Sequence, residues 1–243
     1  MTELSSKSLA QLVSDNHKAA SVFEKYELDF CCKGKRSLQQ ACLEKSLPVE
    51  KLLSELQAIT NSDETPVDYS QMSLTQLADH IVFTHHDYVK REIPRVLAYL
   101  QRVAFKHGDR HPEMNKVFEI YSAVKQEMEE HMQKEEIILF PRIKIVENHA
   151  AERAELKLNM AYLQSPVHVM ETEHEQAGQL LNEIRQLTNN YTPPGDACTT
   201  YRLSFAALQA FELDLHQHVH LENNILFPKA IELFKQISGE TLN

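Results

Sequence analysis

One sequence pattern occurs twice in this chain, and the repeat limits the possible folds more than any other feature. Residues 131–141 read HMQKEEIILFP and residues 218–228 read HVHLENNILFP. Each copy has a histidine, a glutamate four residues later and the ending Ile-Leu-Phe-Pro, with a further histidine upstream at His86 or His174. Residues i and i+4 lie on one face of a helix, so both side chains can reach one point. The repeat predicts two similar helical halves that together supply four imidazoles and two carboxylates.

Composition and charge favour a helical protein with neither a nucleic-acid nor a membrane partner. The 243 residues include five glycines and no tryptophan, and the good helix formers Leu, Glu, Gln, Ala and Lys are frequent. The net charge of -10 disfavours non-specific binding to nucleic acid or anionic bilayers, because both require clustered positive charge. No run approaches the roughly 18 apolar residues of a membrane span.

The location expected from the sequence is a reducing cytoplasm. The first twenty residues lack the basic start and apolar core of a signal peptide. The cysteines, at positions 31, 32, 42 and 198, are too few for a disulfide framework in a chain of this length.

We expect two units joined by a linker. Residues 1–59 predict a small helical domain that contains cysteines, with Ser8 and Asn16 as helix-start residues. Residues 60–72 are polar, include a proline and predict the linker. Residues 73–243 predict the main domain.

The main domain is expected to be an antiparallel four-helix bundle, which makes the chain an all-α protein. Ser73, followed by a glutamine three residues later, is a capping signal for the first long helix. The Phe-Pro that closes each repeat is expected to kink or end its helix. The bundle helices are predicted at about residues 73–106, 112–146, 166–190 and 197–236.

Helical phase selects one histidine from each long helix. At about 100° per residue, that histidine falls on the apolar stripe of its helix, and each repeat adds one glutamate. The side chains selected in this way are His86, His131, Glu135, His174, His218 and Glu222. The neighbours that point away from the stripes are His85, Glu136, His216 and His220.

The selected side chains predict a two-metal site inside the bundle. A carboxylate on an apolar stripe is costly to bury unless it is paired or binds a metal. Nitrogen and oxygen donors without thiolate suit non-haem iron, with manganese or zinc as other candidates. If Glu135 and Glu222 bridge, each metal has two histidines and open positions for O2 or NO. The alternatives are core histidines that hydrogen-bond to buried glutamates, and a purely structural zinc. Glu127 and Glu173, close to the histidines, could support the ligands or line an access path, but an ordinary solvated side chain is the favoured interpretation of both.

The motifs resemble the RIC family, the hemerythrin-like di-iron proteins that repair iron–sulfur clusters, almost from end to end. The similar stretches are residues 29–32 (DFCC), 86–94, 131–135, 170–178 and 218–228. The family's metal ligands would fall on the six side chains selected by helical phase. Two differences stand out. Cys-Cys is followed by Lys33-Gly34 where the family often has Gly-Gly, and the segment at about 147–165 looks longer than usual.

The resemblance implies a cofactor, partners and a function. The cofactor would be two iron ions in a non-haem centre bridged by carboxylate and oxo groups. The partners would be damaged or apo iron–sulfur proteins and the small ligands NO or O2, and a homodimer is one candidate assembly. The implied function is repair of clusters damaged by oxidative and nitrosative stress, by iron donation, in bacterial cytoplasm.

Cys31 and Cys32 are the candidate transfer residues. The nearby Lys33, Lys35 and Arg36 would lower the thiol pKa values and favour thiolate. A thiolate pair could receive iron, an iron–nitrosyl fragment or a damaged cluster, or could undergo redox exchange. The alternative is that one cysteine packs in the small core and the other is incidental.

Three functions remain open from the sequence. The first is an iron donor assisted by the cysteines. The second is an enzyme that reduces nitric oxide at the two irons, so the sequence leaves open whether the protein is an enzyme. The third is a sensor that binds O2 or NO. Sequence alone does not separate them.

Overall fold

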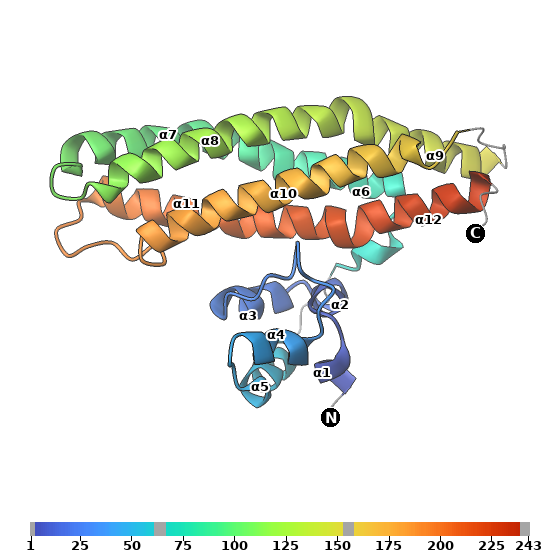
Figure 1. The fold of residues 1–243 in the computed structure, drawn as a ribbon, viewed down its shortest axis with the longest axis horizontal. Helices are drawn as coiled ribbons and strands as arrows, with labels where there is room; N and C mark the ends of the chain where they lie inside the picture. Colours follow the sequence, from blue (N-terminus) through green and yellow to red (C-terminus); the bar gives the residue numbers. More distant parts are fainter. Residues whose placement is uncertain (1–2, 61–66, 153–157, 239–243) are drawn as a thin grey trace.

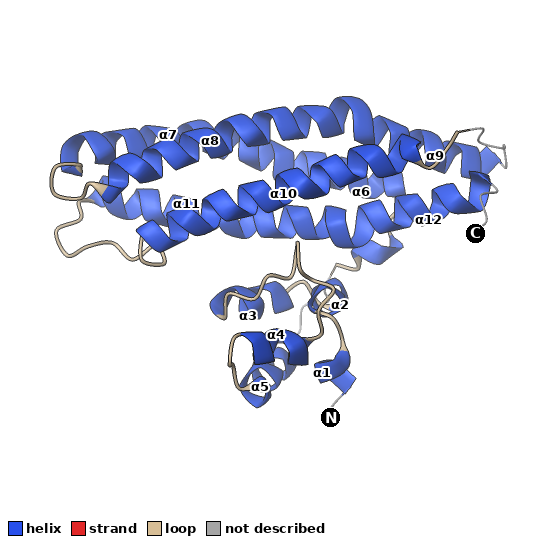
Figure 2. Ribbon diagram, viewed as in Figure 1, coloured by secondary structure: helices blue, strands red, loops and turns tan. Residues whose placement is uncertain are grey.

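The computed structural model describes residues 3–60, 67–152 and 158–238. Within these ranges the regular structure is helical, and β-strands are absent (Figure 2). Long helices lie side by side in a bundle, and short helices from the start of the chain pack beneath it (Figure 1). The all-α prediction is confirmed. In the described ranges, no helix has both the length and the apolar character needed to cross a bilayer.

The short helices precede the bundle in the sequence. Ser8 and Ser37 each cap a helix through a reciprocal bond with a glutamine three residues on, and the two serines pair through an antiparallel bridge. The helices are α1 (Glu3–Ser6), α2 (Leu9–Asp15), α3 (Ala19–Lys25), α4 (Leu38–Glu44) and α5 (Val49–Thr60). The division of the chain at 60–72 stays a prediction, and residues 61–66 of that linker lie outside the described part.

Each long arm of the bundle except the third combines α-helix with a π-helical turn. The first follows a short 3-10 turn, η1 (Tyr69–Gln71). The first arm is α6 (Leu74–Ile81), η2 (Val82–His86) and α7 (Asp87–His107). The second is α8 (Glu113–Lys134), η3 (Glu135–Leu139) and α9 (Phe140–Glu152). The third is α10 (Ala161–Leu187), and the fourth is α11 (Thr199–Leu221), η4 (Glu222–Leu226) and α12 (Phe227–Ser238).

The third arm begins earlier than its predicted start at residue 166. Helix α10 starts at Ala161 and contains Pro166. A proline cannot donate to the carbonyl four residues before it, which is that of Tyr162. Arg142 Nη1 donates to this carbonyl instead, at 2.8 Å. The proline is therefore accommodated inside the helix because a side chain of α9 satisfies the freed oxygen.

Neither repeat ends its helix at Phe-Pro. Pro141 and Pro228 are the second residues of α9 and α12, and each follows a π-helical turn. A π turn changes the local hydrogen-bond pattern, and such turns are one of the usual sources of a helix kink. Each π turn begins at the glutamate of its repeat, so the irregular backbone lies at the candidate ligands.

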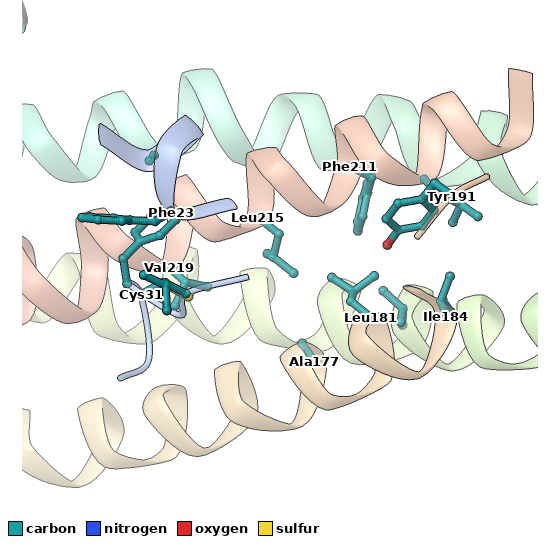
Figure 3. Packing of buried hydrophobic residues seen from close by; sticks show 14 of the residues in the cluster. Phe23, Cys31, Ala177, Leu181, Ile184, Tyr191, Phe211, Leu215 and Val219 are labelled. Carbon is teal, nitrogen blue, oxygen red and sulfur yellow. The ribbon is translucent and has the colours of Figure 1, made fainter. Parts of the chain in front are cut away.

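The hydrophobic core continues from the short helices into the bundle. Phe23 and Cys31 belong to the same buried cluster as Leu215 and Val219 of α11 (Figure 3). The ring of Phe30 also lies against His216 and His220, with centroids 6.2 and 5.8 Å away. The small unit is thus packed onto the outer side of α11.

Polar contacts reinforce this interface. Glu24 of α3 accepts a hydrogen bond from Nδ1 of His216 and forms an ion pair with Arg185 at 3.4 Å. Asn224 donates to the carbonyl oxygen of Cys31 at 2.9 Å. His216 and His220 point away from the bundle interior as expected, but the small unit covers them.

The buried side chain of His220 is expected to make the folded state sensitive to acid. Its side chain is 3% exposed, and burial lowers its pKa to about 4. An unfolded histidine titrates near 6.5, so the unfolded chain binds more protons between these values. Neutral His220 therefore contributes fully to the free energy of unfolding above about pH 6.5. This contribution is lost as the pH falls toward 4. We expect it to reach about 2–3 kcal/mol of unfolding free energy.

The test is urea unfolding of metal-free protein from pH 4 to 7.5, compared with His220→Gln. His216 titrates in the opposite sense, because Glu24 outweighs its burial and raises its pKa. The difference between wild type and variant isolates His220. If the unfolding free energies of wild type and variant changed with pH in parallel, the prediction would be contradicted.

Candidate metal centre

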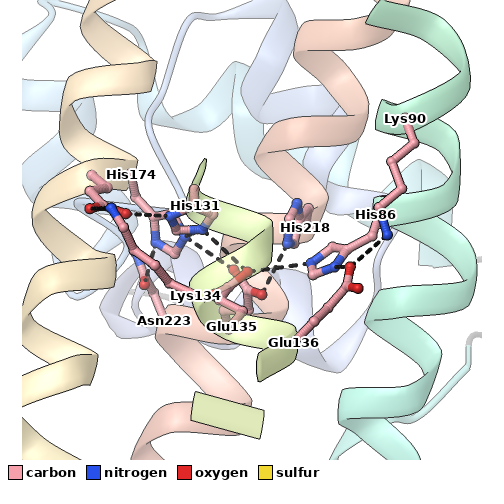
Figure 4. A network of polar contacts seen from close by, with 11 residues as sticks. His86, Lys90, His131, Lys134, Glu135, Glu136, His174, His218 and Asn223 are labelled. Atoms are coloured by element: carbon pink, nitrogen blue, oxygen red, sulfur yellow. Dashed lines mark hydrogen bonds and ion pairs between the residues drawn. The ribbon is translucent and has the colours of Figure 1, made fainter. Parts of the chain in front are cut away.

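The structure brings the six selected side chains together at the centre of the bundle (Figure 4). Each is at most 3% exposed. His86 closes η2, His131 lies in the last turn of α8, and His174 lies in the middle of α10. His218 lies in the last turn of α11, while Glu135 and Glu222 open η3 and η4.

Two overlapping groups of four ligand atoms form. In each group, the ligand atoms lie within 4.8 Å of one another. One group is His86, Glu135, His218 and Glu222, and the other is His131, Glu135, His174 and Glu222. Both carboxylates are therefore common to the two groups, and each group has two imidazoles of its own. The sequence did not show which histidines pair.

Imidazole nitrogens point at the shared carboxylates. Nε2 of His86 and Nε2 of His131 both lie 3.3 Å from Oε2 of Glu135. On the other side, Nε2 of His218 lies 3.0 Å from Oε1 of Glu222, and Nε2 of His174 lies 3.1 Å from its Oε2. The carboxylates lie between the imidazole pairs, as bridging ligands of two ions would.

Three of the four imidazole rings are oriented by an oxygen atom in hydrogen-bond contact with Nδ1. Nδ1 of His86 lies 2.7 Å from Glu136, and Nδ1 of His131 lies 3.0 Å from Glu173. Nδ1 of His174 lies 2.9 Å from Oδ1 of Asn223. An oxygen acceptor at Nδ1 selects the tautomer that leaves Nε2 with a free lone pair, as metal-binding histidines require. Lys90 and Lys134 in turn pair with Glu136 and Glu173.

No pattern in the sequence indicated that Glu136 supports a ligand, and for Glu173 the sequence favoured the wrong one of two interpretations. Glu136 points away from the carboxylates, as helical phase predicts, yet it contacts a histidine of a different helix. The interpretation of Glu173 as a solvated side chain is wrong, because its contacts with His131 and Lys134 lower its pKa to about 2. Glu127 is exposed, as interpreted. A partner on another helix leaves no periodic signal in the sequence.

The donor set fits bound cations. Nε2 of His131 and Nε2 of His174 face each other at 3.0 Å, although the Nδ1 contacts leave a lone pair on both. Nε2 of His86, both oxygens of Glu135 and Oε2 of Glu222 are buried without a hydrogen-bond partner among the described residues. Buried polar atoms of this kind are costly unless something binds them. Positive ions between the imidazoles and carboxylates would satisfy all of these atoms.

The charges of the site lead to the same conclusion. Burial opposes ionisation of Glu222, but its facing histidines hold the pKa well below the ordinary value. Burial also opposes a charge on His131, but Glu135 and Glu173 raise its pKa to about 10. The pKa values of both carboxylates are lowered, so they stay anionic, and they draw protons onto His86 and His131, whose pKa values are raised. A metal ion could replace those protons.

Cys31 and Cys32 lie in the loop between α3 and α4. Their sulfurs are 3.8 Å apart, and Sγ of Cys31 lies 3.4 Å from Oδ1 of Asp29. The expected lowering of the thiol pKa is wrong for Cys31: the neighbouring Cys32, burial and Asp29 raise its pKa well above the ordinary value. Lys33 and Lys35 are exposed, so their charges face solvent.

Known proteins match the chain over most of its length. The hemerythrin HHE cation binding domain matches residues 77–230, and a domain of unknown function, DUF542, matches residues 5–60. The iron-sulfur cluster repair protein YtfE of Enterobacter sp. (strain 638) is 35% identical over 225 residues, which are 92% of this chain and 96% of the relative. The proteins of that name from Yersinia pseudotuberculosis serotype O:1b (strain IP 31758) and Yersinia pestis (strain Pestoides F) are 35% and 34% identical, each over 93% of this chain and 96% of the relative.

Proposed function

Because this chain belongs to the family of hemerythrin-like iron–sulfur cluster repair proteins, we propose that it binds two iron ions in its bundle and donates iron to damaged clusters. One ion would lie between His86 and His218, and the other between His131 and His174. Glu135 and Glu222 would bind both. The observation that carries the proposal is the pair of four-residue groups that share these two carboxylates.

The ligand chemistry favours iron. Imidazole and carboxylate donors without sulfur suit Fe(II) and Fe(III) better than they suit soft metals. Iron bound there would supply redox and Lewis-acid chemistry and would also be the cargo of the repair reaction. The expected clients are iron–sulfur proteins that have lost iron. The free cysteines suit a reducing compartment, so we place this activity in the bacterial cytoplasm.

The protein residues have separable tasks in this proposal. Glu136, Glu173 and Asn223 fix ring orientation by accepting hydrogen bonds from Nδ1 of three ligand histidines. Buried apolar side chains such as Met128 and Met170 line the same helices and exclude bulk water. Cys31 and Cys32 are the proposed transfer residues, since they lie on the small unit that covers α11.

Iron transfer is the direct test. Full-length protein loaded with ⁵⁷Fe is mixed anaerobically with an apo-ferredoxin, sulfide and a thiol reductant, and cluster formation is followed by circular dichroism and Mössbauer spectroscopy. We expect ⁵⁷Fe in the new cluster and a matching loss from the donor. A Cys31→Ala, Cys32→Ala double variant is expected to transfer more slowly with unchanged iron content, whereas Cys198→Ala serves as the matched control.

Other outcomes would replace the proposal. Iron that stays in the bundle while N2O accumulates with NO and a reductant would indicate a nitric oxide reductase. Reversible binding of O2 or NO without iron loss or turnover would indicate a sensor. Equal transfer by the double variant would remove only the cysteines from the mechanism.

A further inference from the structure

The loop that carries the vicinal cysteines contains a third potential ligand. Oδ1 of Asp29 and the sulfurs of Cys31 and Cys32 lie within 4.8 Å of one another. The same oxygen accepts backbone N–H bonds from Cys31, Cys32 and Lys33, at 3.2, 2.9 and 3.2 Å. These bonds fix the turn, and with it the direction of the following side chains.

The spacing of the three atoms suits one tetrahedral ion. Two sulfurs bound tetrahedrally at about 2.3 Å lie roughly 3.8 Å apart, and a carboxylate oxygen at about 2.1 Å lies roughly 3.6 Å from each sulfur. The observed separations are 3.8 Å between the sulfurs and 3.4 Å from Asp29 to Cys31. The turn around Asp29 accompanies this spacing of the adjacent cysteines.

Contacts with the bundle fix where this loop lies. Asn224, two residues after Glu222 in η4, donates to the carbonyl oxygen of Cys31 at 2.9 Å. The adjacent Asn223 contacts Nδ1 of His174 at 2.9 Å. One π turn therefore contacts both the loop and a ligand of the candidate metal centre.

A cleft of about 360 Å³ opens between the loop and the bundle. Its lining includes Asp29, Cys31 and Cys32 on one side and His174, Glu175 and Gln179 of α10 on the other. The three loop ligands thus border the same cavity as a histidine of the buried centre. An ion that passed between the two sets of ligands could move through this cleft.

We propose that Asp29, Cys31 and Cys32 form a second metal site, specific for a thiophilic divalent ion, which receives iron as it leaves the bundle. The identity of the ion as iron rests on the proposed function, whereas the site itself rests on the loop geometry. Binding replaces each S–H proton, which passes to solvent, and no electron is transferred. A client thiolate can then displace these ligands one at a time.

Cobalt substitution tests the site independently of repair activity. The full-length protein, with its bundle loaded with iron, is titrated anaerobically with Co²⁺ in the presence of a phosphine reductant. We expect one additional Co²⁺ per chain, with near-ultraviolet thiolate-to-cobalt absorption in the difference spectrum. Cys31→Ser and Cys32→Ser are expected to abolish this absorption, whereas Cys198→Ser leaves it intact.

Asp29→Asn separates ligation from loop structure. The asparagine keeps a side-chain oxygen for the three backbone N–H groups but loses the charge. Groups that only orient a ligand typically change affinity about 10- to 100-fold, so we expect Co²⁺ binding at least about tenfold weaker. Unchanged affinity in this variant would exclude Asp29 as a ligand and overturn the three-ligand site.

Failure of the inference and failure of the proposed function are distinguishable. If the wild-type protein showed no thiolate-to-cobalt absorption but still transferred iron to apo-ferredoxin, only the second site would be overturned. A bundle that binds no iron would overturn the proposed function, and Co²⁺ binding at the loop would still be measurable in that protein.

Discussion

Replacing both Glu135 and Glu222 by glutamine is expected to reduce bound iron from about two ions per chain to a small fraction of one. Both carboxylates belong to both groups of candidate ligands, so the double change removes charge from each position at once. Neutral amides bind iron weakly, and four imidazoles alone do not neutralise the ions. Iron analysis and the optical spectrum after anaerobic loading measure the loss.

The stability of the same variant gives a second measurement. Bound iron stabilises the folded state by about 4 kcal/mol at a free concentration 1,000 times the dissociation constant. We expect this increase in wild type and no increase in the variant. Without metal, the variant is expected to be less stable than wild type at neutral pH, because glutamine cannot form the ion pairs with the histidines that, despite burial, lower the pKa values of both carboxylates.

A matched control is Glu127→Gln with Glu183→Gln. It changes two exposed carboxylates on α8 and α10, two helices that contribute candidate ligand histidines, and is expected to retain full iron content. If the Glu135, Glu222 variant also retained two ions, these carboxylates would not be the bridging ligands.

Replacing Arg185 by methionine is expected to lower the unfolding free energy by about 3–5 kcal/mol. Nη2 of Arg185 lies 2.8 Å from Glu212, which is 3% exposed, and its Nε also donates to that carboxylate. Tyr191 donates to the same group at 2.7 Å. Methionine keeps most of the apolar stem but leaves Glu212 buried without its cation.

Urea unfolding at neutral pH measures this effect. Arg202→Met on the exposed side of α11 is the control and is expected to change stability by less than about 0.5 kcal/mol. Adding Glu212→Gln to Arg185→Met should recover part of the loss, because the unpaired charge disappears. If Arg185→Met alone lowered the unfolding free energy by less than about 1 kcal/mol, Glu212 would not be left unpaired.

The sequence predicted the fold class and the family, and both are confirmed. Helical phase was informative because the ligand histidines share the period of the apolar core residues around them. The structure brings together the six side chains chosen on that basis. The assignment of these side chains as iron ligands stays a prediction until metal analysis is done.

Features that depend on contacts between helices could not be predicted. The partners of Nδ1 lie 42 to 50 residues away along the chain, and Arg142, which accommodates Pro166, lies on another helix. The lysines near Cys31 suggested a lowered pKa because distance in sequence was taken for distance in space. Burial and the adjacent thiol act in the opposite direction.

The pairing of histidines also bears on the origin of the repeat. One group of ligands combines His86 from the first half with His218 from the second, and the other combines His131 with His174. Neither half alone contains a complete group. An ancestral chain equivalent to one half of the bundle could have assembled both groups only as a symmetric dimer of two copies, and gene duplication with fusion would then have made that dimer permanent. Once fused, each copy could diverge, as Glu136 and its counterpart Asn223 have done.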